Sequence, residues 1–272
     1  MFLDVYQGKF EKMVITATTA NSWIFPDLKN WAENTDDLID DIVKCYEAGA
    51  AIAHVHLPRG EEIETVKRIR ERCDIIIQAG MSSYPIEDRK PDFHAKPDLL
   101  SVIANHHAEH FPEGSINVIH DLDELEQYCI SSKKFNIKVE WEIWHTGSYW
   151  NLKYLIDKGV LDPPYVLTLF FNWPGGTWSP PSADEYLHRI KYIPEDSIHT
   201  ISVMGKEQTK IAVLAIQHGG NVRVGTEDFP FIKEGVPAKD NAEIVARMVR
   251  ISKEMGREIA DPTEARKILG LK

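Results

Sequence analysis

Eight short apolar segments recur along the chain, and most of them are followed by a segment with helical spacing. Segments such as 74–79 (DIIIQA) and 165–171 (YVLTLFF) are apolar throughout, which is typical of parallel strands covered on both faces. Eight strand–helix units in 272 residues predict an α/β fold, a single-domain TIM (β/α)8 barrel. The predicted strands are 13–18, 50–56, 74–79, 99–104, 137–144, 165–171, 199–203 and 221–224, and the predicted helices are 36–48, 61–72, 121–131, 149–158, 183–192, 206–217, 240–255 and a short one from 261.

A doubly wound parallel sheet is the alternative architecture. The turn after the first predicted strand carries no G-x-G-x-x-G motif, which weakens a dinucleotide-binding fold. Neither a linker-like stretch nor a change of composition marks a second domain. Residues 1–12 mix charged and apolar side chains and are predicted to form an N-terminal arm ahead of a barrel spanning 13–272. Thr35 is the predicted N-cap of the first helix.

The charge balance narrows the range of partners. The chain holds 31 Lys and Arg against 42 Asp and Glu, so its net charge is −11, and it has no basic block. This argues against a nucleic acid or an anionic membrane as partner. Neither the apolar core of a signal peptide nor an apolar run of about 18 residues occurs. Three widely spaced cysteines, Cys45, Cys73 and Cys129, indicate reduced thiols in a cytoplasmic compartment.

Two histidines end the second predicted strand. His54 and His56 are two residues apart, so on a strand they point to the same face and form a natural pair of metal ligands. In a closed barrel Glu227 would reach the same rim, and two imidazoles with a carboxylate describe a catalytic zinc site or, equally by spacing, a non-heme iron(II) site. Hydrogen bonds to backbone are the alternative role. Three further histidines lack this two-residue register and are predicted to line the pocket rather than bind metal: His106, His107 and His110.

Charged side chains also occur in two predicted strands that are otherwise apolar. Arg223 lies in the last strand, with Glu227 and Asp228 directly beyond it. Burying a charged group without a partner is costly, so this cluster predicts either a site or a salt bridge at the rim. The fifth strand carries Glu140 and Glu142, and Arg223 is a candidate partner for either carboxylate.

The H-x-H pair and the segment RVGTED (223–228) together resemble the beta-keto acid cleavage enzyme family. The resemblance extends from about Met13 to Leu271 and is strongest at CYEAGAAIAHVH (45–56) and GGNVRVGTED (219–228). It implies a TIM barrel, a homo-tetramer, and a Zn²⁺ ion held by the two histidines and the glutamate of these motifs, His54, His56 and Glu227. It also implies a Claisen-type exchange in which a beta-keto acid and acetyl-CoA give acetoacetate and a new acyl-CoA.

The same resemblance implies roles for the charged residues. Zinc would polarise the ketone as a Lewis acid. Asp228 is expected to act as the base, Arg223 to stabilise the oxyanion, and the fifth-strand acid, Glu142 rather than Glu140, to share the acid–base work. Another zinc-dependent barrel lyase or hydrolase without CoA, or a non-catalytic barrel that binds a metal or a small acid, are the alternatives.

The segments that hold substrate in this family are altered in the chain. The third strand runs into Gly80-Met81-Ser82-Ser83, and the fourth into Ala104-Asn105-His106. The segment after the first strand holds no acid that could pair with an ammonium group. An uncharged or apolar keto acid is therefore expected rather than 3-keto-5-aminohexanoate. The predicted substrate contacts are Gly80, Ser82, Asn105 and Trp23.

Overall fold

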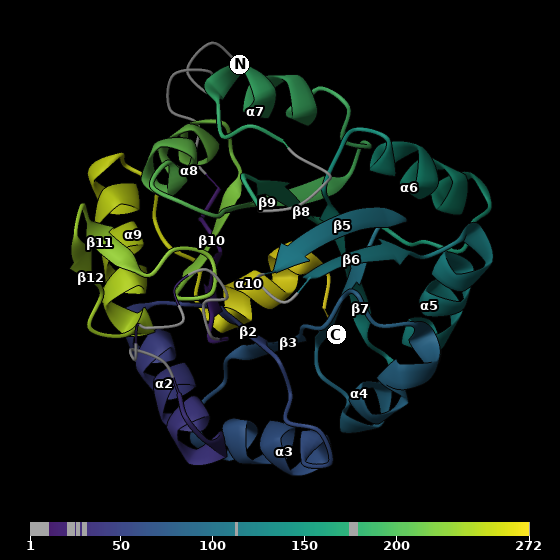
Figure 1. Ribbon diagram of the computed structural model, residues 1–272, viewed down its shortest axis with the longest axis horizontal. Coiled ribbons are helices and arrows are strands. Elements are labelled where there is room, and N and C mark those ends of the chain that lie inside the picture. Colours follow the sequence, from purple (N-terminus) through teal and green to yellow (C-terminus); the bar gives the residue numbers. More distant parts are fainter. Residues whose placement is uncertain are drawn as a thin grey trace.

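Eight parallel strands close into a barrel in the order β1-β10-β9-β8-β7-β4-β3-β2 (Figure 1), which confirms the predicted TIM-barrel fold. The structure is a computed structural model and describes residues 11–20, 25, 28, 32–111, 114–173 and 179–271. Most of the predicted N-terminal arm therefore lies outside the described residues. The barrel strands are β1 (Ile15–Thr18), β2 (Ile52–Val55), β3 (Ile76–Ala79), β4 (Leu99–Ile103), β7 (Lys138–Ile143), β8 (Tyr165–Phe171), β9 (Ser197–Val203) and β10 (Asn221–Gly225).

Helices lie at the predicted positions around the barrel, and two short ones at 86–89 and 90–95 are additional to the predicted set. The cap of the first helix also differs: Asn34, not Thr35, caps α2, because Asn34 has extended backbone angles and its side chain accepts a hydrogen bond from the Asp37 amide. The Thr35 hydroxyl donates to Glu61 instead. The helices are α2 (Thr35–Ala48), α3 (Glu62–Arg72), the 3-10 helix η1 (Ile86–Arg89), α4 (Lys90–Ala95), α5 (Leu122–Phe135), α6 (Ser148–Asp157), α7 (Ala183–Ile190), α8 (Gln208–Gln217), α9 (Asn241–Glu254) and α10 (Pro262–Leu269).

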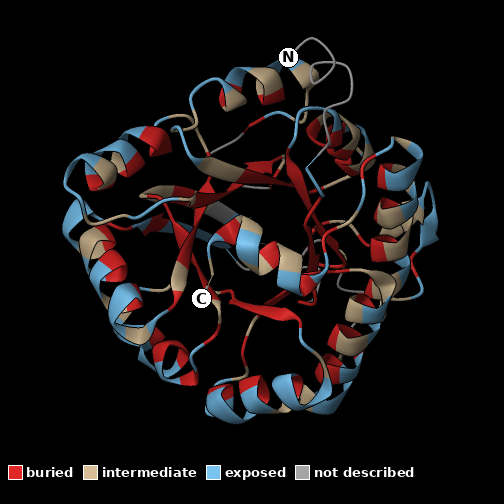
Figure 2. Ribbon diagram, turned by 180° about the vertical axis from the view of Figure 1, so that it is seen from behind, coloured by how far each residue is buried: buried red, intermediate tan, exposed pale blue. Residues whose placement is uncertain are grey.

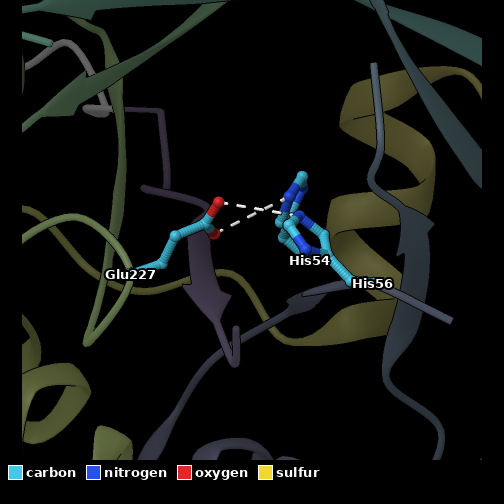
Figure 3. A group of neighbouring side chains, drawn as sticks. All are labelled: His54, His56 and Glu227. Carbon is cyan, nitrogen blue, oxygen red and sulfur yellow. Dashed lines mark ion pairs between the residues drawn. The ribbon is translucent and has the colours of Figure 1, made fainter. Parts of the chain in front are cut away.

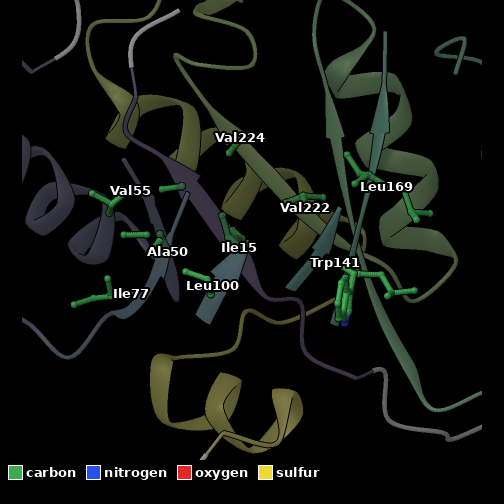
Figure 4. Packing of buried hydrophobic residues seen from close by; sticks show 14 of the residues in the cluster. Ile15, Ala50, Val55, Ile77, Leu100, Trp141, Leu169, Val222 and Val224 are labelled. Atoms are coloured by element: carbon green, nitrogen blue, oxygen red, sulfur yellow. The ribbon is translucent and has the colours of Figure 1, made fainter. Parts of the chain in front are cut away.

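Successive side chains of each barrel strand point alternately out of the barrel and into it. Side chains such as Ile15, Val55, Ile77 and Leu169 face outward and pack against the surrounding helices (Figure 4). Most inward side chains at the N-terminal ends of the strands are also apolar, and they pack against Leu269 and its neighbours in α10, which crosses that end of the barrel (Figure 2). This end of the barrel is therefore closed by packing.

Farther along the strands the inward side chains are polar. The next inward positions include Thr16, Ser101 and Glu140, and beyond them come His54 and Arg223, all of them buried. The sequence predicted strands apolar on both faces, but this layer is not, because it forms the floor of the site at the C-terminal ends of the strands.

Two antiparallel hairpins were not predicted. The first, β5 (His106–Phe111) and β6 (Gly114–Ile119), lies between β4 and α5 and crosses in front of the barrel opening in Figure 1. The second is formed by β11 (Phe231–Lys233) and β12 (Val236–Pro237). The sequence of β5, HHAEHF, is too polar to give a strand signal, because this hairpin lies on the barrel rather than in its core.

Two further expectations bear on the chain as a whole. All three cysteines are free, with Cys45 and Cys129 buried. In the part of the chain that the structure describes, the helices are too short or too polar to cross a membrane.

Candidate metal centre and active-site cavity

His54, His56 and Glu227 converge at the C-terminal mouth of the barrel. His54 lies in β2, His56 follows that strand, and Glu227 follows β10, which β1 separates from β2. Their ligand atoms all lie within 4.8 Å of one another (Figure 3). The Oε2 and Oε1 atoms of Glu227 are 3.8 Å from His54 Nε2 and 3.6 Å from His56 Nε2. The structure thus brings together the three predicted metal ligands as a possible metal site.

The surroundings of His54 favour the metal-binding form of its imidazole. Gln78 Oε1 lies 3.2 Å from His54 Nδ1, so a proton on Nδ1 leaves the Nε2 lone pair directed at Glu227 and His56. Burial, together with the nearby Arg223 charge, holds the pKa of His54 well below its usual range. A neutral imidazole with its other nitrogen hydrogen-bonded is the state in which histidine binds a metal, so these residues fit a divalent ion.

Gly80 lies against the two imidazoles. A β-carbon at this position would lie 2.8 Å from His54 Nε2 and 2.9 Å from His56 Nε2. Its predicted contact with substrate is therefore less direct than its contact with the candidate ligands. The backbone here is held by the buried Arg89, which donates hydrogen bonds to the carbonyls of Gly80 and Met81 and pairs with Asp92.

Replacing Gly80 with alanine is expected to weaken metal binding by about 10- to 100-fold, the scale of changes next to metal ligands, because both imidazoles must move. Competition with a chelator of known affinity measures this change. Gly220→Ala is the matched control, because a β-carbon added there would lie 2.5 Å from Nε2 of His199, a histidine outside the candidate metal centre. Equal metal affinity in the Gly80→Ala variant and the parent would contradict the expectation.

Arg223 and Asp228 form a buried pair beside the candidate metal centre. The Nε and Nη2 atoms of Arg223 donate to the two Asp228 oxygens at 3.2 and 2.9 Å, and Nη2 also lies 2.9 Å from Glu227 Oε2. Ser202 donates to Asp228 Oδ2 at 2.9 Å. Burial raises the pKa of Asp228 to about 6, although Arg223 opposes the shift. Arg223 borders the cavity and Asp228 does not.

Glu142 provides a second acid. It faces inward from β7, and it accepts hydrogen bonds from Ser82 Oγ at 2.7 Å and from Trp144 Nε1 at 3.3 Å. Burial and the neighbouring Glu140 carboxyl raise the pKa of Glu142 to about 8. Glu140 is buried one inward position deeper and does not border the cavity, whereas Glu142 does. A carboxyl group in this state can exchange a proton near neutral pH.

These side chains surround a cavity of about 510 Å³ at the mouth of the barrel. Apolar and aromatic residues line much of it, and Trp144 stacks on Phe170 with ring centroids 4.1 Å apart. Ser82, a predicted substrate contact, is among the lining residues. The lining residues are His54, His56, Met81, Ser82, Ser83, Tyr84, Gly114, Ser115, Ile116, Glu142, Trp144, Phe170, Trp173, Arg223 and Glu227.

Several predicted residues lie elsewhere. Asn105 has a positive φ of 93° and donates to the His120 carbonyl at the base of the β5–β6 hairpin, so it does not border the cavity. Trp23 lies outside the described residues. The three clustered histidines lie in β5, and His107 is buried.

The residues that sequence reasoning missed are mainly aromatic. Trp144 follows the inward Glu142 by two residues, and Phe170 follows the inward Thr168 in the same way. Their two-residue spacing was a signal that could have placed them at the mouth. Ile116 had no such signal, because its hairpin was not predicted.

A TIM barrel with a possible three-residue metal site and buried acid–base groups at the mouth of one cavity defines a barrel enzyme. The family model of beta-keto acid cleavage enzymes matches residues 33–271, and the chain belongs to that family.

Three known proteins illustrate the relationship. The 3-keto-5-aminohexanoate cleavage enzyme of Acetoanaerobium sticklandii is 31% identical over 96% of this chain and 99% of its own length. The 3,5-dioxohexanoate:acetyl-CoA acetone transferase of Paraburkholderia graminis is 24% identical over 96% of both. The solved binary complex of ObcA with oxaloacetate is 15% identical with a TM-score of 0.71, covers 89% of this chain and 67% of that one, and shows the same fold.

Proposed function

We propose that this enzyme is zinc-dependent and that it condenses a beta-keto acid with acetyl-CoA to give acetoacetate and an acyl-CoA. The exchange moves the CH2–COO⁻ unit of the keto acid from its acyl group to the acetyl group. One carbon–carbon bond breaks, one forms, and the thiol passes to the released acyl group. The observation that carries the proposal is the meeting of His54, His56 and Glu227 with Arg223 and Glu142 in one cavity. The name of the Paraburkholderia relative supports acetyl-CoA as co-substrate.

Each of these residues has a separate role in the proposed reaction. The two histidines and Glu227 would hold the zinc ion, which would supply Lewis-acid polarisation of the keto group. Arg223 lies beside these ligands and stabilises the negative charge that develops on the keto oxygen. Glu142 borders the cavity and exchanges the proton of the methylene group between ketone and carboxylate.

The role that we propose for Asp228 differs from the one expected from the sequence. The sequence assigned it as the base, but its carboxylate accepts from Arg223 and Ser202 and does not border the cavity. We therefore propose that Glu142 moves the proton and that Asp228 acts through Arg223, whose guanidinium it orients. A reducing cytoplasmic location, supported by the three free cysteines, and a homo-tetramer stay predictions.

Incubation with acetyl-CoA and a panel of beta-keto acids, with acetoacetate as the measured product, tests the reaction. Formation of acetoacetate that depends on both substrates is expected. Cleavage of a keto acid without acetyl-CoA would instead indicate a zinc-dependent lyase or hydrolase that does not use CoA. Absence of any turnover across the panel would favour a barrel that only binds its ligand.

The panel also tests the expected preference for an apolar substrate. Among the described residues that line the cavity, Glu142 and Glu227 are the only carboxylates, and Glu142 already accepts from Ser82. An ammonium group on the substrate would therefore lack a dedicated partner. We expect 5-methyl-3-oxohexanoate to have a kcat/KM about tenfold or more above that of 3-keto-5-aminohexanoate or 3-oxoadipate. The preference is disproved if the amino substrate has the highest kcat/KM of the three.

A further inference from the structure

The two faces of β6 have different surroundings. Residues 116 and 118 share one face of the strand and residues 117 and 119 the other. Val118 is buried in an apolar cluster with Trp144, Phe170 and Trp173, and Ile116 continues the same face along the cavity. Ile119 points away and is 67% exposed. The inner face of the hairpin therefore forms part of the cavity wall.

Stacked rings attach this hairpin to the barrel. His107 in β5 pairs with Val118 in β6, and its ring stacks on Trp144 with centroids 3.5 Å apart and an interplanar angle of 18°. Trp144 stacks in turn on Phe170, and the Arg223 guanidinium lies 5.2 Å from the Phe170 ring centroid. One column of packed groups thus runs from the hairpin to the candidate metal centre.

The base of the hairpin is held as well. The amide of His120 donates to the Asn105 carbonyl at 2.8 Å, and the Asn105 side chain returns a hydrogen bond to the His120 carbonyl at 2.9 Å. The His120 ring contacts the Ser82 carbonyl and the Glu124 carboxylate, both at 2.9 Å. These contacts hold the base of the hairpin against the barrel, so its inner face can select among substrates by shape.

The two ends of the cavity offer different chemistry. A keto acid whose oxygens lie at His54, His56 and Arg223 has its reacting carbons at the polar end. Its remaining substituent must occupy the rest of the cavity, where Ile116 and Trp173 present apolar surface. Ile116 is still 50% exposed, so it has apolar surface free for a ligand.

We propose that Ile116 is a specificity-determining residue: the β5–β6 hairpin recognises the part of the substrate remote from the reacting carbons and accepts an apolar substituent there. The inference rests on the proposed function and deepens it by assigning the substrate side chain to a contact with this hairpin. A branched aliphatic residue at this place favours alkyl groups and disfavours a charged group, because the charge would lose its hydration without a partner.

The test compares substitutions on the two faces of β6. Ile116→Ala removes apolar contact, so kcat/KM for 5-methyl-3-oxohexanoate is expected to fall about tenfold. Ile116→Asp places a carboxylate at the apolar end, so the ratio of kcat/KM for 3-keto-5-aminohexanoate to that for the alkyl acid is expected to rise about tenfold or more. Ile119→Asp is the matched control on the opposite, exposed face and should leave the ratio unchanged. Melting temperature and zinc content, measured on every variant, identify any loss of fold.

Calorimetric binding of the same two keto acids without acetyl-CoA gives a second, independent measurement. If the parent protein makes no acetoacetate but Ile116→Asp still shifts the binding ratio, the proposed reaction is wrong and the assignment of Ile116 holds. The assignment is overturned if neither Ile116 variant changes the ratio of kcat/KM values or the ratio of binding affinities for the two keto acids. It is also overturned if Ile119→Asp changes these ratios as much as Ile116→Asp does. Should Ile116→Asp fail to fold, Ile116→Ala alone decides between these outcomes.

Discussion

Zinc content is expected to fall from about one ion per chain to about a tenth of that or less when His54 and His56 are both replaced by alanine. Glu227 alone would then remain of the three candidate ligands. Turnover should fall on the order of 1000-fold, which corresponds to the several kcal/mol that a Lewis acid contributes to charge stabilisation. Elemental analysis of the purified protein and steady-state assays measure the two effects.

The control for this variant is His94→Ala, because His94 is an exposed histidine in α4 that contacts the Lys90 carbonyl and the edge of the Phe135 ring, neither of which lines the cavity. Its metal content and activity should match those of the parent. Protein that binds no transition metal with both histidines intact would disprove the metal centre. A stoichiometric iron signal would replace zinc with iron in the proposal, since the same ligands suit iron(II).

The second large effect is expected when the buried acids Glu142 and Asp228 are replaced by their amides. Glu142→Gln should lower kcat about 100-fold or more, the usual contribution of a general acid or base, while zinc content stays the same. Ser82 and Trp144 donate to the same oxygen of Glu142, and the amide oxygen of glutamine can accept both hydrogen bonds, so the variant removes proton transfer rather than packing. Full activity of Glu142→Gln would exclude Glu142 as the group that moves the proton.

Asp228→Asn should also lose about 100-fold in turnover and retain zinc, because Arg223 loses the charge that it pairs with through two hydrogen bonds. Ser202→Ala is the matched control: it removes one neutral donor from Asp228, and about 1 kcal/mol, or roughly fivefold in rate, is expected. If Asp228→Asn is as active as the parent, Asp228 serves only the packing around the ligands and Arg223 keeps its position without it.

The positions of the metal ligands could be predicted from the sequence because they follow local rules. Residues two apart on a strand share a face, and every strand of a parallel barrel ends at the same rim. His54 and His56 met the first condition, and the strand–helix alternation placed Glu227 at the same rim. The same rule placed Glu140 and Glu142 on one face of their strand, but it did not say which of the two borders the cavity.

The roles of other residues could not be predicted because they depend on packing between distant segments. Gly80 lies against the two imidazoles, and Asn105 closes the base of a hairpin that the polar sequence of β5 did not signal. Asp228 is adjacent to Glu227 in the chain, yet it lies behind Arg223 and outside the cavity lining. No spacing rule states which of two neighbouring carboxylates faces a cavity.

The sequence by itself determined the barrel and the candidate metal ligands. The periodicity of apolar residues within each segment, and the alternation of strand and helix segments along the chain, can both be recognised in the sequence directly. Only the tertiary structure decided what surrounds those ligands. Ile116 lines the cavity because His107 stacks on Trp144, a contact between a hairpin and a strand end that are far apart in the chain. Such contacts depend on how whole elements pack together, and local sequence patterns do not encode that arrangement.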